Sequence, residues 1–149
     1  MAATRIQIVI DANDVRRLGD FWVAATGYVE EDVDAFVRGI VEAGHAPEGS
    51  TVEEDGKLRW REYVSLRHPD DPADERGIGT GRRILLQEVP EPKSVKDRIH
   101  LDLLVGPDRR EAEVERLLGL GASIVEERDD PGSRHTVMAD PEGNELCVS

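Results

Sequence analysis

The sequence contains one short pattern twice, and this internal repeat limits the possible folds more than any other feature. In the first copy, the apolar run 6–10 leads into Asp14, an amphipathic segment and Gly27. In the second copy, the run 99–103 leads into Asp108, another amphipathic segment and Gly121. The glycine follows the aspartate by 13 positions in both copies. A strand, a helix cap, a helix and a glycine in the same order twice indicate two copies of one module, with a shared site between them.

The hydrophobic pattern predicts the elements of each copy. In the first, Asn13 or Asp14 caps a helix that ends at Gly27, and apolar residues at helical spacing form its buried face: Leu18, Phe21, Trp22 and Ala25. An added helix is expected within 30–45, and Asp55-Gly56 predicts a hairpin over 51–60. The remaining strands of this copy are expected at 63–67 and 84–89, with a flexible loop over 70–81.

The second copy lacks the added helix and hairpin. Strands are expected at 99–105, 123–127, 135–139 and 144–148, and Asp108 is expected to cap the helix. Its buried face is predicted to contain Val114, Leu117 and Leu118. The order is therefore βαβββ, preceded by an extended βαβββ.

Composition excludes several classes of function. A net charge of −13 argues against a nucleic-acid partner, because phosphate binding requires a basic surface. Neither a signal peptide nor an apolar run of about 20 residues is present, so we expect no membrane partner. Cys147 is the only cysteine, which fits a reducing compartment. We therefore expect a cytoplasmic protein.

Four stretches carry a resemblance to the vicinal oxygen chelate superfamily, which includes glyoxalase I, bleomycin-resistance proteins and extradiol dioxygenases. They are 14–27, 85–91, 98–103 and the turn 140–144. More narrowly, the chain resembles small bacterial glyoxalase-like domain proteins. The likeness covers both ends of the chain and leaves residues 30–80 poorly matched.

The resemblance implies an α+β fold in which two βαβββ modules form an open barrel that lines a cavity. We expect one domain over 1–149, with module 1 at about 4–90 and module 2 at about 98–149. An extra helix and hairpin lie within module 1, at about 30–60. The expected partners are a small-molecule ligand in the cavity and a second copy in a homodimer.

Metal-binding relatives hold a divalent ion with one residue from the first and last strand of each module. The resemblance places these four positions at Gln7, Gln87, His100 and Cys147. Only His100 is a usual ligand, since two neutral amides do not offset the charge of a dication. The expected cofactor is Zn, Ni, Mn or Fe held at His100, or no cofactor at all. Gln7 and Gln87 alternatively satisfy hydrogen bonds in a polar cavity, and Cys147 alternatively serves as a small buried apolar residue.

His100 and Asp102 are the candidate catalytic residues. They alternate with leucines along one strand, so both side chains point to the same face. One interpretation is that Asp102 orients His100 so that it can act as a base. The alternative is that both side chains belong to a solvated face of the strand. Trp22 and Trp60 are further candidates for ligand contact, and core packing is the alternative for each.

Two classes of function follow from these expectations. The first is a glyoxalase-like enzyme with lyase, isomerase or dioxygenase-type chemistry in the cavity between the modules. The second is a metal-free protein that binds or sequesters a small molecule, as bleomycin-resistance relatives do. The sequence does not name a substrate.

Overall fold

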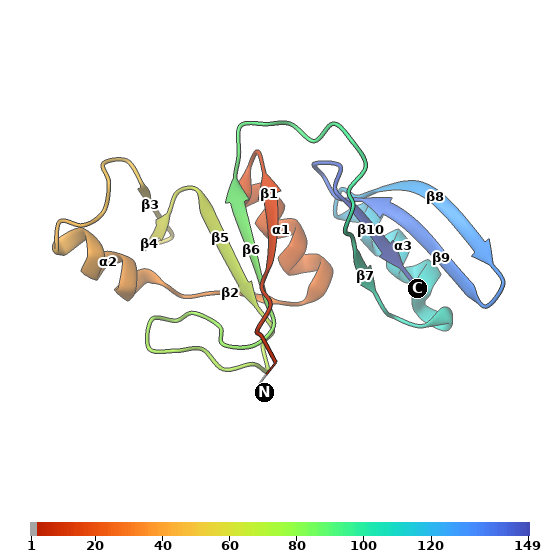
Figure 1. Ribbon diagram of the computed structural model, residues 1–149, viewed down its shortest axis with the longest axis horizontal. Coiled ribbons are helices and arrows are strands. Elements are labelled where there is room, and N and C mark those ends of the chain that lie inside the picture. Colours follow the sequence, from red (N-terminus) through yellow and green to blue (C-terminus); the bar gives the residue numbers. More distant parts are fainter. Residues whose placement is uncertain (1–2) are drawn as a thin grey trace.

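The computed structural model describes residues 3–149 and divides them into two sheet-and-helix modules (Figure 1). The elements of the first module are β1 (Ile8–Ala12), α1 (Val15–Thr26), β2 (Val29–Glu30), α2 (Asp34–Glu42), β3 (Thr51–Glu54), β4 (Lys57–Trp60), β5 (Tyr63–Arg67) and β6 (Arg83–Glu88). Those of the second module are β7 (Leu101–Leu103), α3 (Pro107–Gly119), β8 (Ser123–Asp130), β9 (Ser133–Ala139) and β10 (Glu145–Val148).

The strand order confirms the repeat. The first sheet has the order β1-β6-β5-β2 and the second has the order β7-β10-β9-β8. In each module the first strand pairs in parallel with the last, while the other pairs are antiparallel. Module 1 is therefore βαβββ with α2 and the β3-β4 hairpin inserted between its second and third strands. The protein has the predicted α+β fold of two such modules.

Helix α1 begins and ends as its sequence predicts. The Asp14 side chain accepts a hydrogen bond from Arg17 N at 3.0 Å and so caps the first turn. Gly27 closes the helix with a φ of 72°, a conformation that glycine adopts without steric cost. All four residues of the predicted apolar stripe are buried: Leu18, Phe21, Trp22 and Ala25.

Several boundaries differ from the prediction. Glu30 belongs to the short strand β2, and α2 begins only at Asp34. The cap of α3 is Gly106 and not Asp108, because Pro107 occupies the first helical position, where its missing N–H leaves no bond unmade. Leu118 is 41% exposed and lies outside the buried face of α3.

Two strands of the second module are longer than expected; β7 is shorter, and β10 begins one residue late, at Glu145. The turn Pro131-Gly132 lets Asp130 pair with Ser133, which extends the β8-β9 hairpin beyond the predicted strands. Strand β7 is confined to Leu101–Leu103, and His100 directly precedes it. The predicted Asp55-Gly56 hairpin is confirmed, with φ values of 49° and 75° as a two-residue turn requires.

Buried side chains from both modules form one core cluster. Leu18, Leu66 and Leu86 of module 1 belong to the same cluster as Leu117 and Met138 of module 2. Each of these five side chains is completely buried. The two modules are therefore joined by packing as well as by the connection between β6 and β7 (Figure 1).

The second module also contacts both ends of α1. The Glu142 carboxylate accepts hydrogen bonds from Asn13 N at 2.7 Å and from Asp14 N at 2.8 Å, at the start of the helix. Arg116 donates to the carbonyls of Ala24 and Ala25 at 2.7 and 2.9 Å, in its last turn. A negative charge thus lies at the amino end of the helix and a positive charge at the carboxyl end, the favourable arrangement for its dipole.

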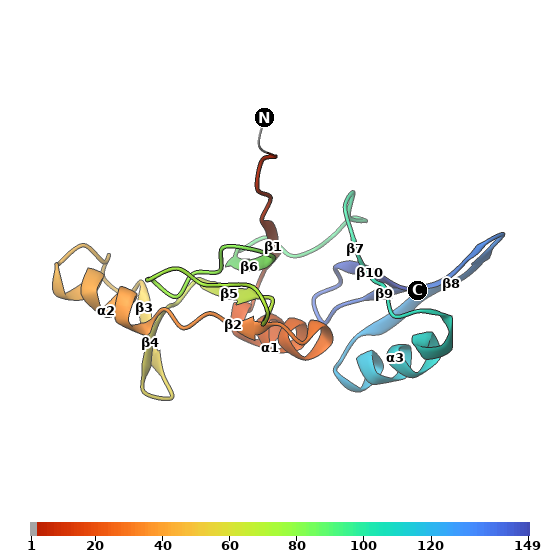
Figure 2. The ribbon, with the colours of Figure 1, turned by 90° about the horizontal axis from the view of Figure 1, so that it is seen from below.

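Figure 2 shows α1 and α3 on the same side of the two sheets, so these two helices leave the opposite face of each sheet uncovered. We call these the open faces. On β6, Ile84 and Leu86 are buried toward α1, while Arg83, Leu85 and Gln87 alternate onto the open face. Among residues 3–149, none of the helices has the length and apolar character needed to cross a membrane.

Candidate functional site

The open face of the second sheet carries the His100–Asp102 pair. Leu101 and Leu103 of β7 pack against the core, so Asp102 between them points to the open face. His100 Nδ1 lies 2.7 Å from Asp102 Oδ1, a hydrogen-bond distance. Both side chains are partly exposed and accessible from solvent. The structure therefore brings together the two residues that strand alternation places on one face.

Cys147 completes this group from the neighbouring strand. It lies opposite Asp102 in the register of β10 with β7. Its Sγ is 3.8 Å from His100 Nδ1. One donor atom from each of His100, Asp102 and Cys147 can be chosen so that all lie within 4.8 Å of one another. We refer to these three residues as the His100 cluster.

The His100 cluster does not have the geometry of a nucleophilic triad. In such a triad the nucleophile and the carboxylate contact different nitrogens of the imidazole. Here Asp102 and Cys147 both approach Nδ1, which cannot donate to one and accept from the other. Burial raises the pKa of the Cys147 thiol, and the negative charge of Asp102 raises it further. Cys147 is therefore a neutral thiol, and His100 Nε2 is the ring nitrogen that neither Asp102 nor Cys147 contacts.

The donor atoms of the His100 cluster, all from the second module, are of types that bind divalent metal ions. Imidazole nitrogen, carboxylate oxygen and thiolate sulfur are the three ligand types that zinc accepts, and a site with three protein ligands leaves positions for other oxygens. Metal binding by Cys147 requires loss of its thiol proton, which a coordinated cation promotes. The chemistry of the His100 cluster is thus compatible with a metal ion.

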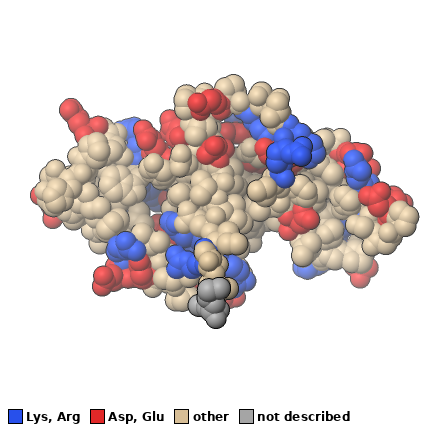
Figure 3. Space-filling model, viewed as in Figure 1, with Lys and Arg blue, Asp and Glu red and all other residues tan. Residues whose placement is uncertain are grey.

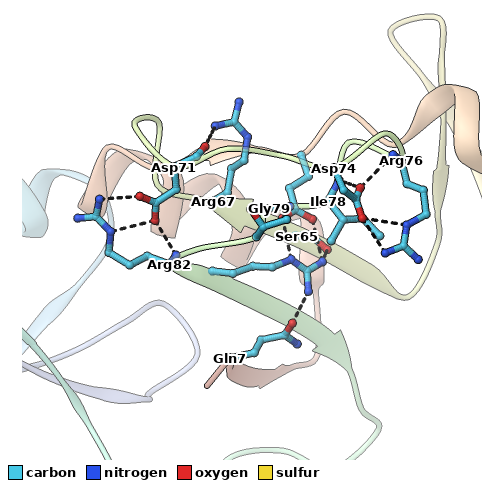
Figure 4. A network of polar contacts seen from close by, with 12 residues as sticks. Gln7, Ser65, Arg67, Asp71, Asp74, Arg76, Ile78, Gly79 and Arg82 are labelled. Atoms are coloured by element: carbon cyan, nitrogen blue, oxygen red, sulfur yellow. Dashed lines mark hydrogen bonds and ion pairs between the residues drawn. The ribbon is translucent and has the colours of Figure 1, made fainter. Parts of the chain in front are cut away.

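Gln7 contributes to a different group of side chains in the first module. Arg83 Nη1 donates a hydrogen bond to Gln7 Oε1, and Nη2 donates to Ser65 Oγ at 2.9 Å (Figure 4). The same guanidinium makes a two-point ion pair with Glu31, at 2.7 and 2.8 Å. Glu31 also accepts from Gly79 N at 2.7 Å. A fixed cation is therefore bound to the amide that the resemblance places at a metal-ligand position, and Gln7 directly precedes β1.

The structure separates the remaining predicted residues. Gln87 lies half-buried on the open face of β6, opposite Tyr63 of β5. Trp60 ends β4 and lines a cavity on the same face. Trp22 is only 1% exposed, and its indole nitrogen donates to Asp140 Oδ2 at 3.2 Å. The indole of Trp22 thus has a structural position in the core, with no surface for a ligand.

Sequence reasoning missed two groups that border these residues. The first is the Arg83–Glu31 pair. Alternation along β6 would have placed Arg83 on the face of Gln87 if the strand had been predicted to begin one residue earlier. Glu31, in contrast, lies in an acidic run that reads as a solvated segment.

The second missed group attaches the inter-module connection to the start of β10. Glu145 accepts from Lys93 Nζ and from Asp97 N, both at 3.0 Å. Burial alone would favour the protonated acid, but these hydrogen bonds lower the pKa of Glu145 to about 2. Burial raises the pKa of Asp97. Glu145 is two residues before Cys147, so this contact fixes the strand that carries the thiol.

Charges are dispersed over the visible surface. Figure 3 shows acidic and basic side chains interspersed around the edges, and a mainly uncharged area across the centre of the same view. The net charge of −13 is therefore not gathered into a single acidic patch on this face. Electrostatic attraction of a large cationic partner to this face is correspondingly weak.

Comparisons with known proteins identify this arrangement. The sequence profile of a family described as glyoxalase-like domain matches residues 7–149. No curated protein matches the sequence significantly.

Solved structures share the fold at low sequence identity. The fosfomycin resistance protein FosX from Mesorhizobium loti matches with a TM-score of 0.63 at 9% identity, over 99% of this chain and 91% of that one. A glyoxalase/bleomycin resistance protein/dioxygenase family enzyme from Burkholderia phytofirmans matches with 0.57 at 13% identity, over 95% and 94%. A variant FosX from Listeria monocytogenes, complexed with Mn(II) and 1S,2S-dihydroxypropylphosphonic acid, matches with 0.60 at 12% identity, over 99% and 90%.

Proposed function

Because this chain belongs to the glyoxalase-like domain family of the vicinal oxygen chelate superfamily, we propose that it is an enzyme that acts on small oxygenated substrates and uses His100 to transfer a proton. The observation that carries the proposal is the 2.7 Å contact between His100 and Asp102 on an open sheet face. Lyase and isomerase reactions that begin with proton removal next to a carbonyl require such a base.

Asp102 prepares His100 for this role. By accepting from Nδ1–H, the carboxylate holds the imidazole in the tautomer whose lone pair is on Nε2. When Nε2 takes a proton, the same carboxylate stabilises the imidazolium that forms. The side chain of His100 is 40% exposed, so a substrate can reach Nε2 from solvent. Cys147 remains a neutral neighbour and takes no covalent part.

A divalent ion would be held by His100, Asp102 and Cys147, and it would supply Lewis-acid polarisation of a substrate oxygen. The structure of the Listeria FosX with Mn(II) supports metal binding within this fold. The sulfur and nitrogen donors here favour zinc over manganese, since manganese prefers oxygen ligands. The base role of His100 and this metal site are therefore alternatives, because an imidazole nitrogen that binds a cation has no lone pair left to remove a proton.

The proposal extends to a cytoplasmic homodimer. Large apolar side chains remain in contact with water in the single chain, among them Ile99 at 85%, Leu104 at 78% and Val125 at 57% exposure. Burying such side chains against a second copy would gain about 25 cal/mol per Å². Sedimentation velocity tests this part: a dimer in the parent that dissociates in Leu104→Asp supports it, and a monomer in the parent contradicts it.

Proton transfer can be measured before the substrate is known. The protein is incubated in D₂O with a panel of small hydroxyketones and ketoaldehydes, and ¹H NMR follows exchange of the hydrogens next to each carbonyl. We expect catalysed exchange for at least one compound in the parent and its loss in His100→Gln. His135→Gln, which changes a histidine of β9 outside the cluster, should retain the activity.

Exchange that persists in His100→Gln would contradict the assignment of the base. Asp102→Asn should retain weaker exchange, because the amide can orient the ring without stabilising its positive charge. A parallel metal analysis uses protein without a histidine tag, dialysed against zinc. About one equivalent in the parent and almost none in His100→Ala supports the metal site. Less than about a tenth of an equivalent in the parent refutes it.

A second candidate is a metal-free binding protein. Two observations favour it: Gln7 is held by the Arg83 guanidinium, and Cys147 carries no charge. A small molecule that raises the melting temperature without proton exchange or metal uptake would support this candidate over the enzyme.

A further inference from the structure

The inserted segment and the loop before β6 enclose a cavity on the open face of the first sheet. Its volume is about 230 Å³. Phe36 of α2, Trp60 of β4 and Ile78 of the loop line it from the inserted segment and the loop. Tyr63 and Leu85 line it from the sheet itself. No atom of the His100 cluster lines this cavity among the described residues, so it is separate from the proposed catalytic group.

The walls of the cavity are unusually aromatic for this chain. The whole sequence has two Phe, two Trp and two Tyr. Three of these six side chains, Phe36, Trp60 and Tyr63, line this one cavity. They come from three different elements, so their convergence is not a consequence of one local pattern. Aromatic walls are typical of small-molecule sites, where flat rings stack or pack edge to face.

The polar floor of the cavity has no net charge. The Glu31 side chain is fully buried and that of Arg83 is 13% exposed, and the two form the ion pair described above. At the rim, Arg16 pairs with Glu30 at 2.9 Å, and Arg59 approaches the same carboxylate at 3.3 Å. Both arginines also approach Glu54, at 3.4 and 3.2 Å, so three arginines are balanced by three carboxylates. The buried Nε of Arg16 has no hydrogen-bond partner among the described residues, and it offers a donor but no counter-charge that is free. A ligand charge placed beside this balanced set would therefore lose hydration without an unpaired opposite charge to replace it. An uncharged ligand is therefore favoured.

Arg83 nevertheless retains one donor for such a ligand. A guanidinium has five N–H groups. Within residues 3–149, Nε and Nη2 direct their hydrogens to Glu31 and Ser65, and Nη1 directs one of its two hydrogens to Gln7 (Figure 4). The remaining Nη1–H can donate to an acceptor oxygen. Its four hydrogen bonds to three residues hold the group in place, so little conformational entropy is lost when a ligand binds.

The volume limits the ligand to one ring. An engineered apolar cavity of about 150 Å³ accommodates benzene. The present cavity, at about 230 Å³, therefore has space for a single six-membered ring with one or two small substituents. A fused bicyclic ligand would require movement of the loop.

From the walls, the neutral floor and the volume, we infer that this cavity binds an uncharged single-ring aromatic molecule that bears an acceptor oxygen, such as a phenol or an aryl carbonyl compound. The oxygen accepts from Arg83, and the ring contacts Trp60 and Phe36. This inference goes beyond the proposed function, because it uses a different module and none of the residues of the His100 cluster.

The test is a titration of ¹⁵N-labelled protein with p-cresol. The chain has two indole N–H signals, from Trp22 and Trp60. We expect the Trp60 signal to shift and saturate, while the signal of Trp22, buried in the core, remains unchanged. Trp60→Phe assigns the two signals. A Trp60 signal that does not move, or equal shifts of both signals, would overturn the inference.

Analogues test the chemistry on the unaltered protein. Toluene lacks the oxygen, p-toluate adds a negative charge and p-methylbenzylamine a positive charge. Each should bind more weakly than p-cresol by about tenfold or more. Equal affinity for p-toluate or the amine would refute the neutral-ligand argument.

A filled cavity tests the location. Ile78→Trp places a larger side chain into the cavity and should weaken p-cresol binding by about tenfold or more, whereas Val95→Trp on the exposed connection between the modules is the matched control. His100→Gln should bind p-cresol like the parent. Loss of binding in His100→Gln, or unchanged binding in Ile78→Trp, would contradict a site in the first module and leave the proton-transfer proposal to its own assay.

Discussion

The buried ion pair between Glu31 and Arg83 makes the sharpest stability prediction. Glu31 is completely buried in its side chain and has three donors within 2.8 Å, two from Arg83 and one from Gly79 N. Removal of one member of a buried pair leaves the other as an uncompensated charge, which costs about 3–5 kcal/mol. Glu31→Ala and Arg83→Met should each lower the free energy of unfolding by that amount.

The double variant distinguishes pairing from packing. In Glu31→Ala/Arg83→Met no buried charge remains, and the main loss is the Gly79 N–H, which becomes an unsatisfied buried donor at about 1–3 kcal/mol. The double variant should therefore be more stable than either single variant. Additive losses would instead reach about 6–10 kcal/mol, much of the 5–15 kcal/mol that a domain has in total.

Urea denaturation followed by circular dichroism gives the three free energies. For a chain of this length, each single variant should also lower the melting temperature by about 6–20 °C. Glu48→Ala, at an exposed position in the loop after α2, serves as the control and should change stability by less than about 0.5 kcal/mol. Single-variant losses below about 1 kcal/mol, or additivity in the double variant, would refute the reasoning.

Three further predictions concern other contacts. Glu142→Ala removes two hydrogen bonds at the start of α1 and should lower the free energy of unfolding, measured by urea denaturation, by about 1–2 kcal/mol. Glu142→Gln should lower it by less. Equal losses would contradict the role assigned to the charge of Glu142. Gly79→Ala would place a Cβ 2.8 Å from the Arg67 side chain and 2.9 Å from that of Glu31, and it should lower the free energy of unfolding by about 1–3 kcal/mol. Gly39→Ala, which has open space in α2, should raise it by about 0.5–1 kcal/mol. The opposite order in urea denaturation would refute the packing argument. Asp71 accepts from Arg82, which holds the pKa of that carboxyl well below its usual value, so its contribution is present above the ordinary aspartate pKa and is lost as the pH falls toward the lowered one. A ¹³C NMR titration should show this low pKa and its return toward the ordinary value in Arg82→Gln; an unchanged value in the variant would exclude the guanidinium as its cause.

The order of helices and strands could be predicted because it depends on local sequence patterns. Aspartate, apolar stripe and glycine define α1, and their repetition defines the second module. Errors occurred where one local signal displaced another. Pro107 took the first helical position and moved the cap to Gly106, and the turn Pro131-Gly132 prolonged a hairpin beyond its apolar residues.

The candidate site was only partly predictable for a related reason. His100 directly precedes β7 and Asp102 lies within it, two positions along the chain, so the alternation of side chains in extended backbone is enough to predict their contact. The Glu31–Arg83 contact spans 52 positions, and it depends on how the insertion folds over the sheet. Hydrophobic periodicity carries no information on which acidic side chain of that insertion is buried against the sheet.

The contacts of Glu142 and Arg116 with the two ends of α1 have a consequence for biosynthesis. A ribosome releases α1 long before either of these partners has been translated, so the nascent helix has the Asp14 cap at its amino end but lacks Glu142 there and Arg116 at its carboxyl end. An isolated helix of 12 residues is only marginally stable in water. We therefore expect the first module to stay loosely structured during translation and to acquire its final form only when the second module emerges and docks.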